Sequence, residues 1–536
     1  MSGPIAEEVR WEPVTIPPVT TDIPKDDSWF EVAGLLFSGL AEVSEDERKL
    51  FARKQVVELW SGLDSFSKDD ELRALSIYGS PGIGKSCEVW AWALRCASQE
   101  IDVLWVHVEN LATAVCFESR GSEFFKCEAE PNQLNHILKS SQAKIVIFDG
   151  YKSDLGAYAS CVLHLVSTKY PLRKVVIVSS LGSGLHAHSF RLKLRQFYKI
   201  EVEPWILEQF LSACKRVDFF DTVRLNFNFD QEKWISASEK EDLLGSVETA
   251  VKEKFFYAGA SARWMFDFST QDVHQEIRDR LGAVNNLRDL LAFTGGMQGT
   301  ESHNHLLMRF SHSAGSDIFF VSQCALDFCL RRWGQGPDIK YAYSLASRHN
   351  NPAFLGWVVQ FDFFDQIKTV ASLSTGNKKI SVSVDSGEHS EEWTVTKVID
   401  FDSKADIFSL TDWQINHWML PELWNQAGYD AACLVTRADG KTCLKIVQIT
   451  KAKKHSLDLN AFATLIQKVS KAYGEIHGID IVFLMPKGSS MPLLEPKGEG
   501  NLSSVEVGDG PATWNKGSEA AKVVARFFKP YCKASS

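Results

Sequence analysis

A glycine-rich turn between an apolar run and a helix-forming segment constrains this chain more than any other feature. The turn reads Gly79-Ser80-Pro81-Gly82-Ile83-Gly84-Lys85-Ser86; residues 73–79 precede it as a strand and residues 86–97 follow it as a helix. Glycine permits the positive φ values and the close backbone approach through which consecutive N–H groups surround a phosphate. The helix adds its positive end at the same point. The sequence therefore predicts a phosphate-binding loop.

Two side chains of the loop and one distant carboxylate complete the predicted site. Lys85 can reach the β- and γ-phosphates of a nucleotide, and Ser86 can offer its hydroxyl to Mg²⁺. Asp149 ends the apolar run of residues 145–148, where a buried strand would present an acid that orients the metal. We therefore predict a P-loop that binds ATP and Mg²⁺, with Ser86 and Asp149 on the metal side.

Hydrolysis requires a cation for the developing charge and a group that orients water. Arg263 follows a run of small residues and can reach the nucleotide from a lid, or else pair with a surface carboxylate. Ser179 and Ser180 end the strand that follows Asp149, where they can sense the γ-phosphate. Many ATPases have a glutamate directly after the magnesium-side acid, where it acts as the base that activates water. Here Gly150 occupies that position after Asp149. We expect slow turnover, or a substitute base such as Asp154 or Glu109.

Strands and helices alternate around the loop. Apolar runs at 73–79, 102–108, 143–150 and 174–180 are separated by helical segments at 86–97, 132–141 and 157–168. This alternation predicts an α/β fold with a parallel sheet covered on both faces. A short strand at 198–204 follows, and residues 205–332 read as a mainly helical lid.

The regions before and after this core have a different character. Five of the 17 prolines lie between Pro4 and Pro24, which favours an extended N-terminal arm. A capping-box pattern at Ser44–Glu47 predicts a helix over residues 44–63. We predict four parts, with boundaries as follows: an arm at 1–44, a P-loop NTPase core at 45–210, a helical lid at 211–335, and a separate α/β domain at 336–536.

The last domain has its own predicted elements. They are a helix at 352–370, strands at 379–385, 392–401, 430–436 and 443–450, a helix at 459–476, a strand at 479–486 and a terminal helix at 519–528. In the predicted hairpin, Asp430 begins one strand, the next strand returns with Gln448, and Lys451, Lys453 and His455 follow. Carboxylates that hold divalent metal, with a lysine near the scissile phosphate, are what phosphodiester cleavage needs.

The neutral amide of Gln448 holds a hard cation more weakly than a carboxylate does. Three groups could assist Asp430: Glu422, Asp365 and the backbone carbonyl of Ile449. Two other interpretations stay open, namely an inactive nucleic-acid-binding domain and a packed α/β domain with ordinary surface lysines. Residues 441–471 hold seven lysines and one acid, which suits either a phosphate-facing surface or a solvated helix face.

Composition narrows the setting. A net charge of -10 over 536 residues argues against a protein that coats nucleic acid. No run approaches the roughly 18 apolar residues of a membrane span, so no membrane partner is expected. Residues 1–10 lack the apolar run of a signal peptide. The 11 cysteines form no CxxC pair, which favours a reducing interior over structural zinc or a disulfide framework.

Several segments together resemble the Crinkler effectors of oomycetes and fungi and the related retrotransposon hot spot proteins of trypanosomes. They are GSPGIGKS, IVIFDG, EVEPWILEQF, FYAGASARWMF and YDAACLV…LKIVQITKAKKH, and the likeness spans roughly residues 45–536. The resemblance implies an AAA-like or STAND-like ATPase joined to a nuclease of the restriction-endonuclease, PD-(D/E)xK type. It maps Arg263 onto a lid sensor, and Asp430, Gln448 and Lys451 or Lys453 onto the nuclease centre. Gln360 stands where members often carry a helix glutamate.

The same resemblance implies DNA as a partner, host nuclear proteins as further partners, and a nuclear location, often in a host cell after secretion. A nucleotide-dependent homo-oligomer is also expected. The leucine-rich translocation segment with which secreted Crinklers begin is not recognisable in residues 1–45. The leading hypothesis is an ATP-regulated, Mg²⁺-dependent DNA endonuclease. Its rivals are a non-catalytic effector whose ATPase switch controls DNA or host-protein binding, and a STAND-type signalling ATPase without a nuclease.

Overall fold

In the computed structural model the chain forms two compact units, Met1–Leu326 and Asp327–Ser536. The residues that the structure describes are 9–17, 22–40, 47–110, 112–151, 160–162, 165, 173–180, 197–227, 240–284, 290, 305–312, 315–333, 339–340, 342–343, 352–374, 378–384, 389–401, 413–421, 428–450, 454–474, 476–486, 492–497, 511–513 and 520–528.

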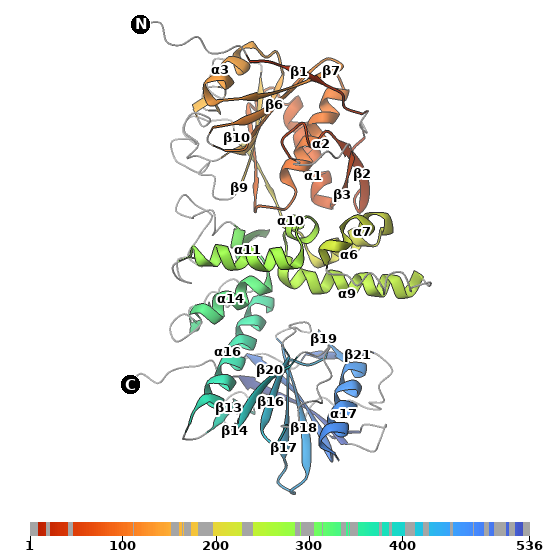
Figure 1. Cartoon of the computed structure of the whole chain (residues 1–536), viewed down its shortest axis with the longest axis vertical. Coiled ribbons are helices and arrows are strands. Elements are labelled where there is room, and N and C mark those ends of the chain that lie inside the picture. Colours follow the sequence, from red (N-terminus) through yellow and green to blue (C-terminus); the bar gives the residue numbers. More distant parts are fainter. Residues whose placement is uncertain are drawn as a thin grey trace. The chain divides into compact units, whose positions relative to one another are not determined.

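An eight-stranded sheet forms the centre of the first unit (Figure 1). In spatial order its strands are β1 (Glu12–Val14), β7 (Glu123–Ala129), β6 (Ala114–Arg120), β5 (Val103–Val108), β8 (Ile145–Tyr151), β9 (Lys174–Ser180), β4 (Ala74–Gly79) and β10 (Phe197–Val202). The strands from β5 to β10 in this order are parallel, and the three at the other edge pair antiparallel. The parallel strands confirm the predicted P-loop α/β fold. The antiparallel edge was not predicted.

Helices cover both faces of this sheet. α1 (Lys54–Lys68) and α2 (Lys85–Ser98) lie on one face, where the indoles of Trp90 and Trp105 pack edge to face at 5.3 Å. α3 (Pro131–Ser140) packs on the other face through Leu134, Ile137 and Leu138. Successive side chains of a strand point to opposite faces of the sheet, and both faces are covered here. The strands must therefore be apolar along nearly their whole length. β9 lies between β4 and β8, so the ends of all three strands meet at one edge.

The N-terminal region differs from the predicted arm and helix. β2 (Ser28–Ala33) pairs antiparallel with β3 (Glu47–Ala52), so the predicted helix over 44–63 is wrong in its first part, and α1 begins only at Lys54. Trp29 and Phe51 are opposite each other in this hairpin, with rings 5.4 Å apart. This cross-strand aromatic pair outweighs the weak helix propensity of the segment. Described residues before position 45 are also packed: Val32 and Leu35 are buried, and β1 joins the large sheet.

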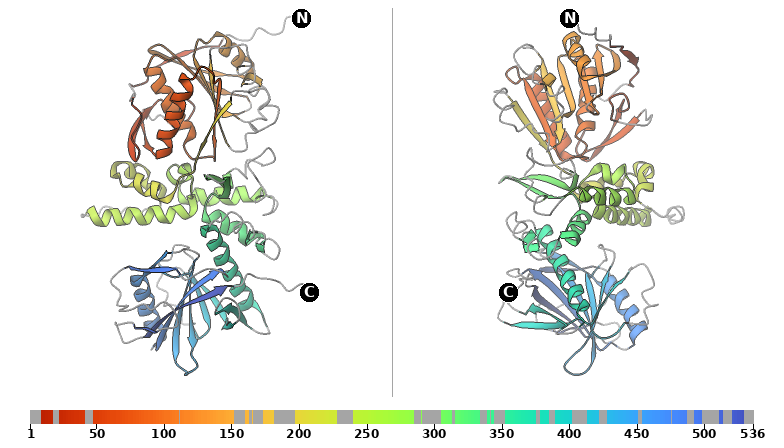
Figure 2. Two further views of the ribbon diagram at one scale, coloured as in Figure 1. Left: turned by 180° about the vertical axis from the view of Figure 1, so that it is seen from behind. Right: turned by 60° about the vertical axis from the view of Figure 1, so that its left-hand side comes forward.

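The described residues of the predicted lid are mainly helical, and Figure 2 shows these helices gathered at one end of the sheet. Its elements are α6 (Leu207–Cys214), α7 (Val217–Val223), the 3-10 turn η1 (Arg224–Phe227), α9 (Lys240–Ala258), α10 (Ala262–Phe266) and α11 (Thr270–Gly282). A hairpin of β11 (Leu307–His312) and β12 (Gly315–Phe320) follows, which was not predicted. α14 (Gln323–Trp333) then crosses the division between the units.

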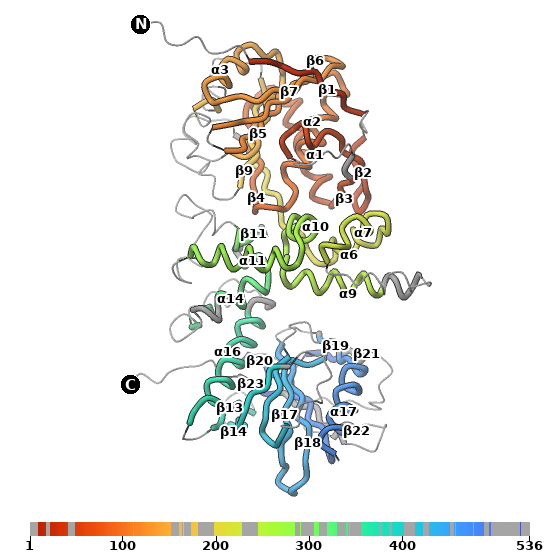
Figure 3. The backbone as a smooth tube through the Cα atoms, in the orientation of Figure 1, coloured from red at the N-terminus to blue at the C-terminus, as the bar shows by residue number. Residues whose placement is uncertain are grey.

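The second unit is a mixed sheet between helices. In spatial order its strands are β14 (Ser390–Thr394), β13 (Lys379–Ser383), β23 (Ala520–Phe528), β20 (Gly478–Pro486), β18 (Thr442–Ile449), β17 (Ala431–Thr436), β16 (His417–Pro421) and β15 (Lys397–Phe401), with β22 (Pro511–Thr513) beside β23. A separate pair joins β19 (Lys454–Asp458) to β21 (Leu493–Lys497). Figure 3 shows α16 (Pro352–Ser372) and α17 (Leu459–Tyr473) on opposite sides of the sheet.

One prediction for the end of the chain is wrong. The predicted terminal helix over 519–528 is the strand β23, which runs parallel to β20 with Val524 opposite Val482. Adjacent valines and phenylalanines suit a pleated surface, and pairing with β20 decides the conformation. Within the described residues, no helix has both the length and the apolar character needed to cross a bilayer.

Candidate functional site

The predicted phosphate-binding loop joins the end of β4 to the start of α2. Gly82 and Gly84 have φ values of 72° and 101°, which side chains with a Cβ rarely adopt. A Cβ on Gly79 would lie 2.5 Å from the carbonyl oxygen of Val202 in β10. The three glycines are therefore required by backbone conformation and close approach. The loop has the form that a phosphate chain needs.

Lys85 lies inside this loop. Its Nζ donates hydrogen bonds to the carbonyl oxygens of Gly79 at 3.1 Å and Ser80 at 2.6 Å, and the residue is 7% exposed. Burial lowers the pKa of the Lys85 ammonium to about 8, and Asp149 opposes this shift. The ammonium is thus bound by neutral carbonyl oxygens. Negatively charged phosphate oxygens would accept stronger hydrogen bonds from it and would replace the carbonyls as its partners.

Ser86 and Asp149 meet beside the loop. Ser86 Oγ donates to Asp149 Oδ1 at 2.6 Å, and Nδ1 of His107 lies 2.6 Å from Asp149 Oδ2. Asp149 is 1% exposed, so both carboxylate oxygens are fixed in a buried setting. A hydroxyl and a carboxylate are hard oxygen donors of the kind that Mg²⁺ accepts. The pair fits a magnesium ion bound together with a nucleotide.

His107 was not predicted from the sequence. It lies in β5 directly opposite Asp149 of the neighbouring strand, and the β5–β8 register brings the two side chains together. The only signal in the sequence is that a histidine lies near the end of the predicted strand 102–108, which precedes the strand that contains Asp149. Its hydrogen bond with Asp149 fixes the orientation of that carboxylate.

The position after Asp149 cannot hold a glutamate in this conformation. Gly150 has a φ of 76°, and a Cβ there would lie 2.7 Å from the carbonyl oxygen of Val108. The β8–β9 register shifts between Phe148 and Tyr151. Of the candidate substitute bases, Glu109 is exposed and accepts from Thr113 Oγ1 at 3.4 Å, and Asp154 lies outside the described residues.

Ser179 and Ser180 end β9, between the loop and Asp149. Ser180 lies opposite Gly79, and Ser179 lies opposite Tyr78. Ser179 is 3% exposed, and its buried Oγ has no hydrogen-bond partner. An unpaired buried hydroxyl is costly unless a ligand completes it. This is consistent with the predicted role beside the γ-phosphate.

The lid reaches the loop through the start of α10. The backbone N–H of Arg263 donates to the carbonyl of Gly82 at 2.9 Å, and a Cβ on Gly82 would lie 2.5 Å from Ser261 Oγ. The side chain of Arg263 is exposed and forms no ion pair among the described residues, so the alternative of a surface carboxylate partner is not seen there. Its charge adds to the lowering of the Lys85 pKa. The backbone of Arg263 therefore lies beside the loop.

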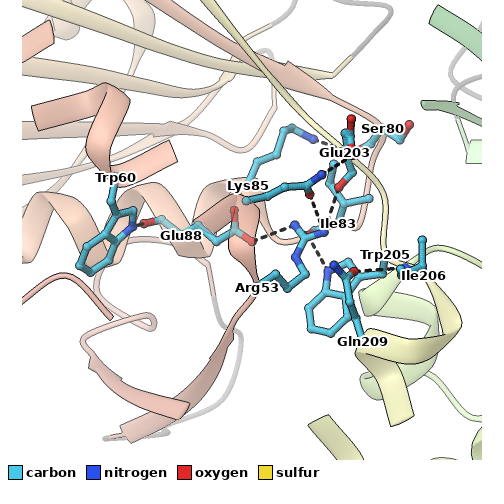
Figure 4. Close-up of polar contacts among 11 residues, drawn as sticks. Arg53, Trp60, Ser80, Ile83, Lys85, Glu88, Glu203, Trp205, Ile206 and Gln209 are labelled. Carbon is cyan, nitrogen blue, oxygen red and sulfur yellow. Dashed lines mark hydrogen bonds and ion pairs between the residues drawn. The ribbon is translucent and has the colours of Figure 1, made fainter. Parts of the chain in front are cut away.

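A buried charged network lies behind the loop (Figure 4). Arg53 pairs with Glu88 at 3.2 Å, and its guanidinium stacks over the Trp205 ring, 4.9 Å from the centroid. Arg53 NH2 and Trp205 Nε1 both donate to the carbonyl of Ile83, at 3.4 and 3.1 Å. Burial raises the pKa of the Glu88 carboxyl, and Arg53 opposes that shift. The network joins the loop to α2 and to the segment that enters the lid, and no pattern in the sequence indicated it.

In the second unit, Asp430 and Gln448 lie at the same end of the β17–β18 hairpin. The backbone N–H of Asp430 donates to Val447 at 2.8 Å, and Asp430 Oδ2 accepts from Ile449 N at 2.6 Å. Gln360 of α16 donates to Asp430 Oδ1 at 3.1 Å. Burial raises the pKa of the Asp430 carboxyl to about 6, and the Ile449 N–H opposes the shift. Gln448 is 4% exposed, with its Oε1 unpaired.

The other groups predicted for this site lie only in part among the described residues. Lys451, Lys453 and Glu422 lie outside the described residues. Asp365 is on α16, five residues after Gln360, and among the described residues no hydrogen bond joins it to Asp430. The described part of the chain contains no cluster of three or more His, Cys, Asp or Glu residues able to hold a metal. The groups that the structure describes here, one carboxylate and two amides, do not by themselves form a complete Mg²⁺ site.

The lysine-rich stretch 441–471 is not one continuous surface. Lys445 is 6% exposed, donates to Glu391 Oε1 at 2.9 Å and stacks over Trp393 at 4.2 Å. Arg526 also donates to Glu391, and together the two cations hold the pKa of that carboxyl at about 2 despite its burial. Lys445 therefore stabilises the core and is not available to a phosphate.

Comparisons with known proteins add little to this geometry. No family model and no curated protein matches the chain. Among solved structures, the Thermotoga maritima RuvB Holliday junction branch migration motor is 11% identical, with a TM-score of 0.28 over 50% of this chain and 92% of that one. A variant of the same motor is 10% identical, with a TM-score of 0.25 over 49% and 91%. Likenesses this weak carry no argument about function.

Proposed function

We propose that the first unit binds and hydrolyses ATP with Mg²⁺. The observation that carries this proposal is the 2.6 Å hydrogen bond from Ser86 to Asp149 beside the buried Lys85. Lys85 would bind the β- and γ-phosphates, while Ser86 and Asp149 would hold the magnesium side. Mg²⁺ would neutralise phosphate charge when bound. Arg263 is in reach of the same loop and adds a second positive charge.

We expect slow turnover. The conformation of Gly150 leaves no room for a base directly after Asp149, and no other carboxylate of the described residues is bonded into the site. Among the described residues, no dedicated group then orients water and takes its proton, whereas groups for phosphate binding and charge stabilisation are present. Such an ATPase suits a switch better than a motor.

Titration of a fluorescent ATP analogue, with and without Mg²⁺, tests the binding step. Wild type should bind with Mg²⁺, and Lys85→Ala should lose at least about tenfold in affinity, because a charge-assisted phosphate contact is removed. The matched control is Lys174→Ala, a buried lysine that donates to Leu72 O at 2.7 Å and lies outside the loop. Equal binding by wild type and Lys85→Ala would sink the proposal.

For the second unit we propose a nuclease-like module that binds DNA. An α16–hairpin–α17–β20 order, with Asp430 beside Gln448, is what the restriction-endonuclease resemblance implies. Cleavage is the alternative. The single described carboxylate and the hydrogen bond from Gln360 favour binding without cutting. The Crinkler relationship, a nuclear site of action and control by nucleotide state belong to this proposal.

Plasmid DNA with Mg²⁺ separates binding from cutting. Wild type, Asp430→Ala and Lys85→Ala should each retard DNA on a gel without nicking it if the domain only binds. Nicking by wild type that Asp430→Ala abolishes would establish the nuclease instead. If wild type neither shifts nor nicks DNA, the nucleic-acid proposal is wrong, and the ATPase proposal stands on its own test.

A further inference from the structure

The β11–β12 hairpin contacts the phosphate-binding loop at Ser80. The backbone N–H of Arg309 donates to Ser80 Oγ at 3.1 Å, and Ser80 is fully buried. Lys85 Nζ donates to the carbonyl oxygen of the same residue at 2.6 Å. β11 therefore passes beside the part of the loop where the Lys85 ammonium lies, and that ammonium marks where the β- and γ-phosphates would be.

The Arg309 side chain is held in an ion pair next to the loop. Arg309 Nε lies 3.1 Å from Glu201 Oε1, and the two side chains are 21% and 13% exposed. Tyr78 donates to the other Glu201 oxygen at 3.1 Å. Burial, reinforced by the charge of Glu201, raises the pKa of the Tyr78 phenol to about 12, so it stays a donor. Tyr78 directly precedes Gly79, so the guanidinium is held one residue before the loop begins.

The hairpin is fixed to the part of the lid that contacts the loop. Ala260 N donates to the carbonyl of Val321 at 3.0 Å, and a Cβ on Gly259 would overlap the same oxygen. The residues that follow, Ser261 and Arg263, contact Gly82. One packed piece of the lid thus contacts the loop at Ser80 and at Gly82.

We propose that Arg309 is an arginine acting within its own chain, which leaves Glu201 and binds the terminal phosphate of a bound nucleoside triphosphate. The proposal rests on the function proposed above. A guanidinium forms bidentate bonds to phosphate as readily as to carboxylate, and a γ-phosphate carries the greater negative charge. A diphosphate lacks that group, so Arg309 then remains with Glu201. The swap distinguishes ATP from ADP and supplies charge stabilisation during hydrolysis.

The test compares affinities for ADP and for a non-hydrolysable imido analogue of ATP, with Mg²⁺, together with kcat for ATP. Arg309→Ala should lose about 10- to 100-fold in analogue affinity and keep its ADP affinity within about twofold. Its kcat should fall on the order of a thousandfold. Arg309→Lys should recover part of the analogue affinity. Glu201→Gln should raise that affinity, because the competing charge is removed.

Arg280→Ala is the matched control, since Arg280 pairs with Glu276 at 2.5 Å with side chains 22% and 29% exposed, away from the loop. It should change neither affinity nor kcat. Equal loss of ADP and analogue affinity in Arg309→Ala would overturn the proposal, because Arg309 would then only anchor the loop. Unchanged analogue affinity in a folded Arg309→Ala or Arg309→Lys variant would also overturn it. If wild type binds neither nucleotide, ATP binding itself fails, and with it this proposal.

Discussion

Arg53 and Glu88 form an ion pair of 3.2 Å directly behind the phosphate-binding loop, with side chains 0% and 6% exposed. Arg53 comes from the turn between β3 and α1, and Glu88 from the first turn of α2. Because Arg53 also donates to the loop carbonyl of Ile83, the pair supports the loop at that residue. A buried pair of this kind is costly to break from one side.

We expect Arg53→Ala to lower the free energy of unfolding by about 3–5 kcal/mol, because Glu88 is left buried without its partner. Replacing both residues, as Arg53→Met with Glu88→Leu, should restore much of the loss. Chemical denaturation of the two variants checks this. Lys54→Ala is the control, since Lys54 and Glu58 are exposed and their pair should contribute at most about 1 kcal/mol. An effect of Arg53→Ala no larger than that of the control would contradict the expectation.

Nucleotide affinity should depend on pH through Lys85. Burial lowers its pKa in the free protein to about 8, and bound phosphates would raise it. Below that pH Lys85 is already protonated, so its contribution to affinity is constant. Above it, binding must take up a proton, and affinity should fall by up to about tenfold per pH unit. Calorimetry at pH about 9 in buffers of different ionisation enthalpy would measure the uptake.

Lys85→Arg is the control for that dependence, because a guanidinium stays charged throughout this range. Its affinity should not fall with pH between about 7.5 and 9.5, whatever its absolute value. The same decline in wild type and Lys85→Arg would assign the pH effect to another group.

Asp430→Asn should stabilise the second unit at neutral pH. Burial raises the pKa of the Asp430 carboxyl from the ordinary 3.8 to about 6 in the folded state. The protonated carboxyl therefore contributes its full stabilisation below pH 3.8, and this stabilisation is lost as the pH rises through about 6. Asparagine removes that loss. In EDTA, the variant should be more stable than wild type by up to about 3 kcal/mol at pH about 7.5, and equal to it at pH about 3.5. Thermal melts across this range check the sign.

Adding Mg²⁺ to the same melts tests the metal site. If Asp430 does not bind the ion, Mg²⁺ should leave the difference between wild type and Asp430→Asn unchanged. A selective rise in the melting temperature of wild type would show metal binding at Asp430, because a ligand that binds only the folded state stabilises it.

Gly150→Ala should be strongly destabilising, because a Cβ would lie 2.7 Å from a backbone carbonyl in addition to the strain of a φ of 76°. Gly440→Ala isolates the second effect, since Gly440 has a φ of 79° and open space around its Cβ position. We expect about 1–2 kcal/mol for Gly440→Ala and clearly more for Gly150→Ala. Equal losses, measured by denaturation, would show that the strand can move to admit a side chain.

The sequence by itself determined the loop and the α/β core. The loop residues are consecutive, so their glycines, Lys85 and Ser86 act together whatever the rest of the chain does, and the apolar run ending at Asp149 marks its strand. Parallel strands end at one edge, which explains why Asp149 could be placed beside Ser86 before the fold was known.

Only the tertiary structure decided which distant residues surround the loop. The register of β5 on β8 brings His107 to Asp149, and the hairpin β11–β12 brings Arg309 to Ser80. Both are single residues without a local pattern. The segments of β3 and β23 were predicted as helices from their local sequence pattern. Local propensity is a weak determinant, and pairing with β2 and β20 supplies backbone hydrogen bonds and cross-strand packing that outweigh it. Contacts between distant segments therefore decided these elements and the surroundings of the loop.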